Sequence, residues 1–178
     1  MTLPLNIVPK PTLELSHHKI HEGNHFTVHK ITTAPGPGPK YFLIIPPPVQ
    51  PDGSVIEIHI IFEIDLITAG VGGTLEFFEN PTIAGPGATL NTVNNNRRSA
   101  TISQVQVFED PAVTFDNPPS LFEGKISGPG AVGEFSRNEE EFVLNELFNY
   151  VLKLTPTAFP SEMNLDLNWY DNRPSSPV

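Results

Sequence analysis

The sequence predicts an all-β protein, an antiparallel β-sandwich or jelly roll with an extended, proline-rich N-terminal arm. Two observations carry this prediction. The 178 residues include 20 prolines, about twice the usual proportion, and proline interrupts the interior of helices and sheets. Between the prolines the dominant hydrophobic period is two, which is typical of strands with one buried face. Many short strands joined by turns are the pattern of a sandwich or jelly roll.

The chain length and the distribution of proline predict a single domain with extended ends. We expect an extended arm over residues 1–11, a β-sandwich domain over 12–171 and a flexible tail over 172–178. Three prolines in the arm prevent regular strand pairing, and the tail combines two prolines and two serines without any periodicity. The 178 residues fit one domain better than two.

Two segments give the clearest strand signals. Between residues 56 and 66 apolar side chains occupy the even positions and charged ones most of the odd positions, and residues 162–170 alternate equally regularly. Each segment therefore predicts a strand with one face in the core. The expected core residues are Ile58, Ile60, Phe62, Ile64, Leu165, Leu167 and Trp169.

Weaker strand signals fill much of the remaining chain. The segments rich in β-branched or aromatic residues and bounded by Gly, Pro or Asn are 24–32, 40–45, 74–78, 100–108 and 121–126. Residues 136–155 differ, because a capping box at Ser136–Glu139 precedes apolar residues with helical spacing. This periodicity favours a helix. The alternative is a hairpin with strands at 141–144 and 149–155 and a turn near Asn145.

Charge and composition exclude several classes of protein. The 20 acidic and 10 basic residues give a net charge of -10, which opposes binding to nucleic acid. The absence of cysteine excludes disulfides, thiolate metal sites and cysteine catalysis. We find no basic and apolar leader and no apolar run long enough for a spanning helix, so neither secretion nor membrane insertion is expected.

One pattern resembles a zinc protease site. The residues His21-Glu22-Gly23-Asn24-His25 match H-E-x-x-H, in which a helix places two histidines on one face and the glutamate acts as general base. Here Gly-Asn favours a turn, and the β-branched residues that follow favour a strand. We therefore predict a turn that leads into a strand, with His25, Thr27 and His29 on one face.

Other candidate sites are weaker still. A metal-binding cupin needs His-x-His, which does not occur, and the acidic residues near 110–117 lack the spacing and glycine of a calcium loop. His59 and Glu63 lie on the odd face of a predicted strand and are either a polar pair or part of a solvated or subunit-facing surface. No catalytic residues, metal or cofactor are predicted, and the protein is not expected to be an enzyme.

The segment Asn94-Asn95-Asn96-Arg97-Arg98 is the strongest polar cluster. Asparagine tolerates left-handed backbone angles, so one interpretation is an exposed loop. In the other interpretation Arg97 and Arg98 form a basic spot on an acidic protein and bind carboxylates of a neighbouring subunit. The sequence leaves both interpretations open.

Several segments in this order resemble a group of bacteriophage virion proteins, the capsid decoration (cement) proteins of the head. The resemblance spans about residues 17–170. It rests on segments such as His17-His18-Lys-Ile-His21-Glu-Gly-Asn-His25, Glu57-Ile-His59-Ile-Ile-Phe62-Glu63, Asn94-Asn-Asn-Arg97-Arg98-Ser99, Tyr150-Val-Leu-Lys-Leu-Thr155 and Leu167-Asn-Trp169-Tyr170. It implies a capsid-bound β protein without catalytic residues, and a hairpin rather than a helix at 140–155.

This resemblance leads to a functional hypothesis. We expect a decoration protein that binds the major capsid protein on the outer surface of the virion, assembles with itself as a trimer, and stabilises the head. The expected contact residues are Leu3, Leu5, Ile7 and Val8 in the arm, with Arg97 and Arg98 in the loop. The alternative function is a jelly-roll module of a tail fibre or spike that binds a carbohydrate or receptor, which would need exposed aromatic side chains.

Overall fold

The structure, a computed structural model, describes residues 19–36, 38–66, 72–126, 133–136 and 141–172, and the backbone alone of 64–66, 126 and 133–136. Residues 19–22 form one helical turn. The strands are β1 (His25–Ala34), β2 (Lys40–Ile45), β3 (Glu57–Leu66), β4 (Gly73–Glu79), β5 (Thr82–Gly85), β6 (Ala88–Thr89), β7 (Val93–Asn94), β8 (Gln106–Glu109), β9 (Ala112–Thr114), β10 (Ser120–Ile126), β11 (Gly133–Ser136), β12 (Phe142–Leu144), β13 (Tyr150–Pro156) and β14 (Ser161–Asn172).

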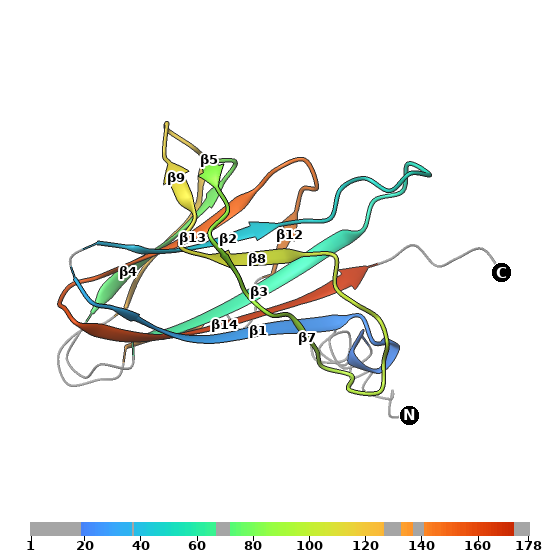
Figure 1. Ribbon diagram of the computed structural model, residues 1–178, viewed down its shortest axis with the longest axis horizontal. Helices are drawn as coiled ribbons and strands as arrows, with labels where there is room; N and C mark the ends of the chain where they lie inside the picture. Colours follow the sequence, from blue (N-terminus) through green and yellow to red (C-terminus); the bar gives the residue numbers. More distant parts are fainter. Residues whose placement is uncertain (1–18, 37, 67–71, 127–132, 137–140, 173–178) are drawn as a thin grey trace, which may run out of the picture.

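These strands form two antiparallel sheets and a ribbon. Sheet A has the order β11-β3-β14-β1-β7, and β12 also pairs with β3. Sheet B has the order β10-β4-β13-β2-β8-β6, while β5 and β9 form a separate two-stranded ribbon. Figure 1 shows the ribbon projecting beyond the main strands. The predicted all-β, antiparallel sandwich is confirmed.

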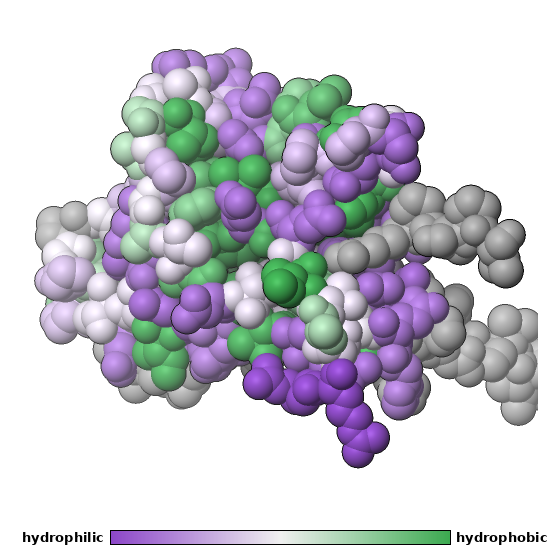
Figure 2. Space-filling model, turned by 45° about the vertical axis from the view of Figure 1, so that its right-hand side comes forward, coloured by the Kyte–Doolittle hydropathy of each residue, from purple (hydrophilic) through white to green (hydrophobic). Residues whose placement is uncertain are grey.

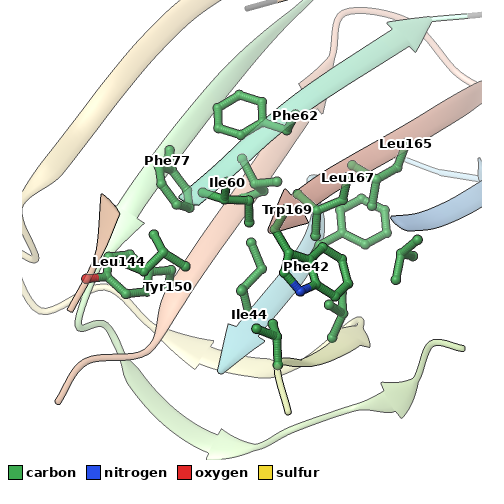
Figure 3. Close-up of a cluster of buried hydrophobic side chains, with 14 of the residues drawn as sticks. Phe42, Ile44, Ile60, Phe62, Phe77, Leu144, Tyr150, Leu165, Leu167 and Trp169 are labelled. Carbon is green, nitrogen blue, oxygen red and sulfur yellow. The ribbon is translucent and has the colours of Figure 1, made fainter. Parts of the chain in front are cut away.

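The core lies between the two sheets (Figure 3). Phe62 of β3 packs edge-to-face on Phe77 of β4, with ring centroids 5.4 Å apart, and lies parallel to Phe142 at 5.9 Å. The expected core residues Ile58, Ile60, Phe62, Leu165, Leu167 and Trp169 are all buried. The backbone of Ile64 pairs with that of Leu165. The alternation of apolar and polar residues in β3 and β14 therefore correctly predicts which face of sheet A points toward the core.

Sheet B is covered on its outer face as well. Leu43 and Val151 lie opposite each other in β2 and β13, point away from the main core, and are fully buried. Phe78 of β4 is opposite Val151, and Phe115 packs on it with ring centroids 4.7 Å apart. The segment after β9 thus covers this face, and β2 and β13 bury both of their faces.

Residues 141–155 are a strand, a turn and a second strand, so the helix favoured by periodicity is wrong. Asn145 starts the turn, because its side-chain oxygen accepts a hydrogen bond from the amide of Leu147 at 2.9 Å. The two strands do not pair as a hairpin, since β12 belongs to sheet A and β13 to sheet B. The chain crosses between the sheets at this turn.

The predicted strand at 100–108 is also too long. Only residues 106–109 form a strand, β8, while 100–105 cross from sheet A to sheet B over one end of the core. Ser103 accepts a hydrogen bond of 3.1 Å from the indole nitrogen of Trp169, and Val105 is buried. These residues close the end of the sandwich and have no strand partner.

Three predictions concern residues outside the described ones. The arm, with Leu3, Leu5, Ile7 and Val8, precedes residue 19, and the tail from 173 onward follows β14. Asn172, expected at the start of the tail, is the last residue of β14. Most of the proposed capping box at Ser136–Glu139 also lies outside.

Candidate functional site

The H-E-x-x-H segment is not a helix. The helical turn ends at Glu22, and Gly23 follows with a φ of 76°, a left-handed conformation that favours glycine. β1 then begins at His25. His21 and His25 therefore do not share a helical face, in agreement with the turn that Gly-Asn predicts.

The asparagines of the Asn-Asn-Asn-Arg-Arg segment hold this turn. Each of the three side chains reaches a different residue of it: Asn94 donates to the carbonyl of Gly23 at 2.8 Å, Asn95 contacts the His25 ring nitrogen Nδ1 at 2.7 Å, and Asn96 donates to the carbonyl of His21 at 3.1 Å. The H-E-x-x-H segment and the Asn-Asn-Asn-Arg-Arg segment are therefore one structural unit. We call residues 19–25, 94–99 and Asn172 the terminal junction.

The same asparagines shape the loop that carries the arginines. The amide of Asn96 donates to the side chain of Asn94 at 2.9 Å, and the amide of Arg98 donates to the side chain of Asn96 at 3.1 Å. These side-chain-to-backbone bonds are the turns that asparagine favours. The loop is therefore ordered, and it presents Arg97 and Arg98 to solvent.

Arg97 and Arg98 differ from most cations that the structure describes. Lys30, Lys40 and Lys153 each form an ion pair, at 3.0 Å with Glu109, 2.6 Å with Asp110 and 2.6 Å with Glu76. Within the described residues neither arginine has an acidic partner. Two adjacent unpaired guanidinium groups on an acidic protein suit the carboxylates of another molecule.

The terminal junction also joins the two ends of the described chain. Lys19 donates a hydrogen bond from Nζ to Oδ1 of Asn172 at 3.2 Å, and Asn172 donates from Nδ2 to Oε2 of Glu57 at 3.0 Å. The hydrogen bonds from Asn172 and His59 hold the pKa of Glu57 below its usual value. Lys19 and Asn172 are far apart in sequence, so no local pattern could have revealed this contact.

A histidine and a tyrosine continue this network on the outer face of sheet A. The His59 ring stacks on Tyr170 with centroids 4.6 Å apart, and both contact Oε2 of Glu141, at 2.9 Å and 2.6 Å. His59 Nε2 lies 3.3 Å from Glu57. Burial and the Glu141 carboxylate raise the pKa of Tyr170, so the phenol stays neutral and donates.

The suggested His59–Glu63 pair is not the contact that forms. Residues four apart on a strand are about 13 Å apart, beyond the reach of a hydrogen bond. His59 instead reaches across to Glu141 and along to Glu57, two residues away on the same face. Among the described residues no group of three or more His, Asp or Glu side chains is arranged to hold a metal ion.

We expect His25 to make the protein less stable at mildly acidic pH. Burial lowers the pKa of His25, whose Nδ1 accepts a hydrogen bond from Asn95. The unfolded chain binds a proton at His25 below about pH 6.5, whereas the folded chain resists it, so stability is lost as the pH falls from there toward the folded pKa. The pKa values of Glu57 and Glu109 are lowered from 4.5, so the stability that these two carboxylates contribute is lost only at more acidic pH.

Urea unfolding at about pH 7.5 and about pH 5.5 measures this effect. His25→Gln should lose less stability between the two pH values than wild type. His21→Gln, at an exposed position, is the matched control and should behave as wild type. Equal losses for His25→Gln and wild type would show that His25 is not responsible.

Comparisons with known proteins identify no relative: no family model, no curated protein and no solved structure matches the chain. Within the residues that the structure covers, no helix is long and apolar enough to cross a membrane.

Proposed function

We propose that this protein is a bacteriophage capsid decoration protein, which binds the outer surface of the head and stabilises it. One observation carries the proposal: Arg97 and Arg98 lie in the terminal junction, which contains residue 19, the first described residue after the arm and residues 12–18. Asn96, directly before the arginines, is hydrogen-bonded to His21, close to the point where residues 1–18 join the described chain. The arginines therefore lie at the end of the sandwich where the described chain begins, and we expect the arm and the arginines to act on one neighbouring surface.

We also infer that the sandwich is a jelly roll. Setting aside the short strands between β4 and β10, the chain changes sheet at each step from β1 to β4 and again from β12 through β13 to β14. β4 and β10 pair within sheet B, and β11 and β12 both pair with β3 in sheet A. Sheet A then has the order β3-β14-β1, and sheet B has the order β4-β13-β2 in the corresponding positions. Two interleaved antiparallel sheets of this order support the two Greek keys of a jelly roll.

The physical roles of the two contact elements differ. The apolar residues of the arm contribute about 25 cal/mol per Å² of surface buried against a neighbour. The arginines contribute charge-assisted hydrogen bonds that fix orientation and weaken as salt rises. We expect the arm to dominate affinity, and the arginines to set the register on the major capsid protein and within a homotrimer.

The surface around the terminal junction is compatible with such a contact. Figure 2 turns this end of the molecule forward and shows hydrophobic residues among hydrophilic ones. Ile102, in the segment that follows the arginines, has 81% of its surface exposed. A glycan-binding module is less well supported, because Trp169, Tyr150 and Tyr170 are buried and do not form an exposed platform.

Heads that lack the protein provide the functional test. Wild type added back should bind them and protect them from heat and low salt. A variant without residues 1–11 should fold but lose protection. Arg97→Ala with Arg98→Ala should show a smaller loss, which shrinks as the salt concentration rises because salt screens the pairing of the arginines in wild type. Lys125→Ala removes an exposed cation of β10 that has no acidic partner among the described residues, and is the control for charge alone.

Two outcomes would contradict the proposal. If the arm-deleted protein binds and protects heads as well as wild type, docking does not depend on the arm. If Lys125→Ala weakens binding as much as the double arginine variant, the arginines act only through net charge. Sedimentation of the free protein tests the trimer separately.

A further inference from the structure

The contact between Lys19 and Asn172 brings together an amine and a carboxamide, two groups that can react with each other. Lys19 Nζ, on a side chain with only 11% of its surface exposed, lies 3.2 Å from Oδ1 of Asn172 and 3.1 Å from Oε2 of Glu22. On the other side, Nδ2 of Asn172 lies 3.0 Å from Oε2 of Glu57. An amine, a carboxamide and two carboxylates therefore follow one another within hydrogen-bond distance.

We propose that Lys19 and Asn172 form an intramolecular isopeptide bond. Lys19 loses a proton to Glu22, and its neutral Nζ attacks the carbonyl carbon Cγ of Asn172. The new N–C bond forms as the bond between Cγ and Nδ2 breaks. Nζ gives up a second proton, and the two protons leave with Nδ2 as ammonium. The products are one amide bond and one ammonium ion, and no oxidant or other reactant is needed.

The hydrogen bonds hold the reacting groups next to each other. Cγ is one bond from Oδ1, so the amine is held beside the atom it attacks, as in an intramolecular reaction of high effective concentration. The orientation of the Asn172 amide is fixed on both sides, since the ammonium faces its oxygen and the carboxylate faces its nitrogen.

The two carboxylates are suitable proton acceptors and donors. Glu22 contacts the attacking nitrogen and Glu57 contacts the leaving nitrogen. Glu57 accepts a hydrogen bond from Nδ2 at 3.0 Å, so it is placed to take up a proton from the intermediate and pass it to the leaving nitrogen. A lysine attacks only as the neutral amine, which is why Glu22 is needed beside Nζ.

The backbone around the pair is held in place. The amide of Asn24 donates to the carbonyl of Lys19 at 3.0 Å, and the amide of Asp171 donates to the carbonyl of Asn24 at 2.9 Å. These bonds fix the helical turn against the end of β14, so little freedom is lost when the two side chains react. The product would be a covalent ring closed between the start and the end of the sandwich, independent of any role on a capsid.

The mass of the purified full-length protein tests the proposal directly. We expect wild type to be lighter than its sequence mass by one ammonia molecule, and a protease digest to contain a branched peptide that joins Lys19 to Asn172. Lys19→Arg keeps the charge and the hydrogen bond but should have its full sequence mass. Glu57→Gln should form the bond more slowly, with both masses present after synthesis.

The controls separate the bond from other losses of ammonia. Cyclisation of an asparagine gives the same mass change, but it would persist in Lys19→Arg and would produce no branched peptide. Wild type at its full sequence mass, even after long incubation, would overturn the proposal and leave the pair as a hydrogen bond. A loss of ammonia without the Lys19–Asn172 peptide would overturn it equally.

Discussion

Truncating Phe62 to alanine should lower the free energy of unfolding by roughly 3 to 5 kcal/mol. Phe62 has 1% of its surface exposed and contacts aromatic rings of both sheets, Phe77 in sheet B and Phe142 in sheet A. Removing the ring leaves a cavity between rigid layers, which cannot collapse without moving a strand. The loss is measured by urea or thermal unfolding.

Val143→Ala is the matched control for this substitution. Val143 lies on β12, beside β3 in the same sheet, but its side chain is 56% exposed. Its truncation should change stability by no more than about 0.5 kcal/mol. A loss below about 1 kcal/mol for Phe62→Ala would contradict the assignment of Phe62 to a close-packed core.

Substituting Gly23 by alanine should be nearly as destabilising, for two separate reasons. Its φ of 76° costs a residue with a Cβ about 1 to 2 kcal/mol. In addition, the new Cβ would overlap the side chain of Ser99, which should add about 1 to 3 kcal/mol. We expect a total loss of roughly 2 to 5 kcal/mol in equilibrium unfolding.

Two further variants separate these contributions. Gly53 has a similar φ of 82°, but a Cβ there would meet nothing within 4 Å, so Gly53→Ala should show the backbone cost alone. Combining Gly23→Ala with Ser99→Gly removes the overlapping side chain and should recover the second part of the loss. If Gly23→Ala is no worse than Gly53→Ala, the close packing of Gly23 on Ser99 is not important for stability.

The sequence predicted the strands of sheet A better than the chain around residue 150, and the reason is burial. β3 and β14 bury one face, so alternation is regular and identifies Phe62 and Trp169 as core residues. β13 buries both faces, so Val151 and Leu152 are both apolar although they point in opposite directions. Together with Leu144 they imitate the spacing of a helix.

The candidate site was predictable only in part. The turn at Gly23 could be predicted from local composition, because Gly-Asn and the following residues oppose a helix. That Asn94, Asn95 and Asn96 bind this turn could not, since the contacts depend on the pairing of β7 with β1. The Lys19–Asn172 contact likewise depends on β1 and β14 being neighbours in sheet A.

The pairing of β1 with β14 has a mechanical consequence. The strands are antiparallel neighbours from His25 opposite Tyr170 to Ala34 opposite Ser161, so the chain enters β1 and leaves β14 at the same end of the ladder. A force that pulls residue 19 away from residue 172 therefore acts perpendicular to the two strands and breaks their hydrogen bonds one after another, starting at this end. The first contact to bear that tension is the one between Lys19 and Asn172. The ladder can begin to open only after that pair has separated, and the paired residues of β1 and β14 then carry the load.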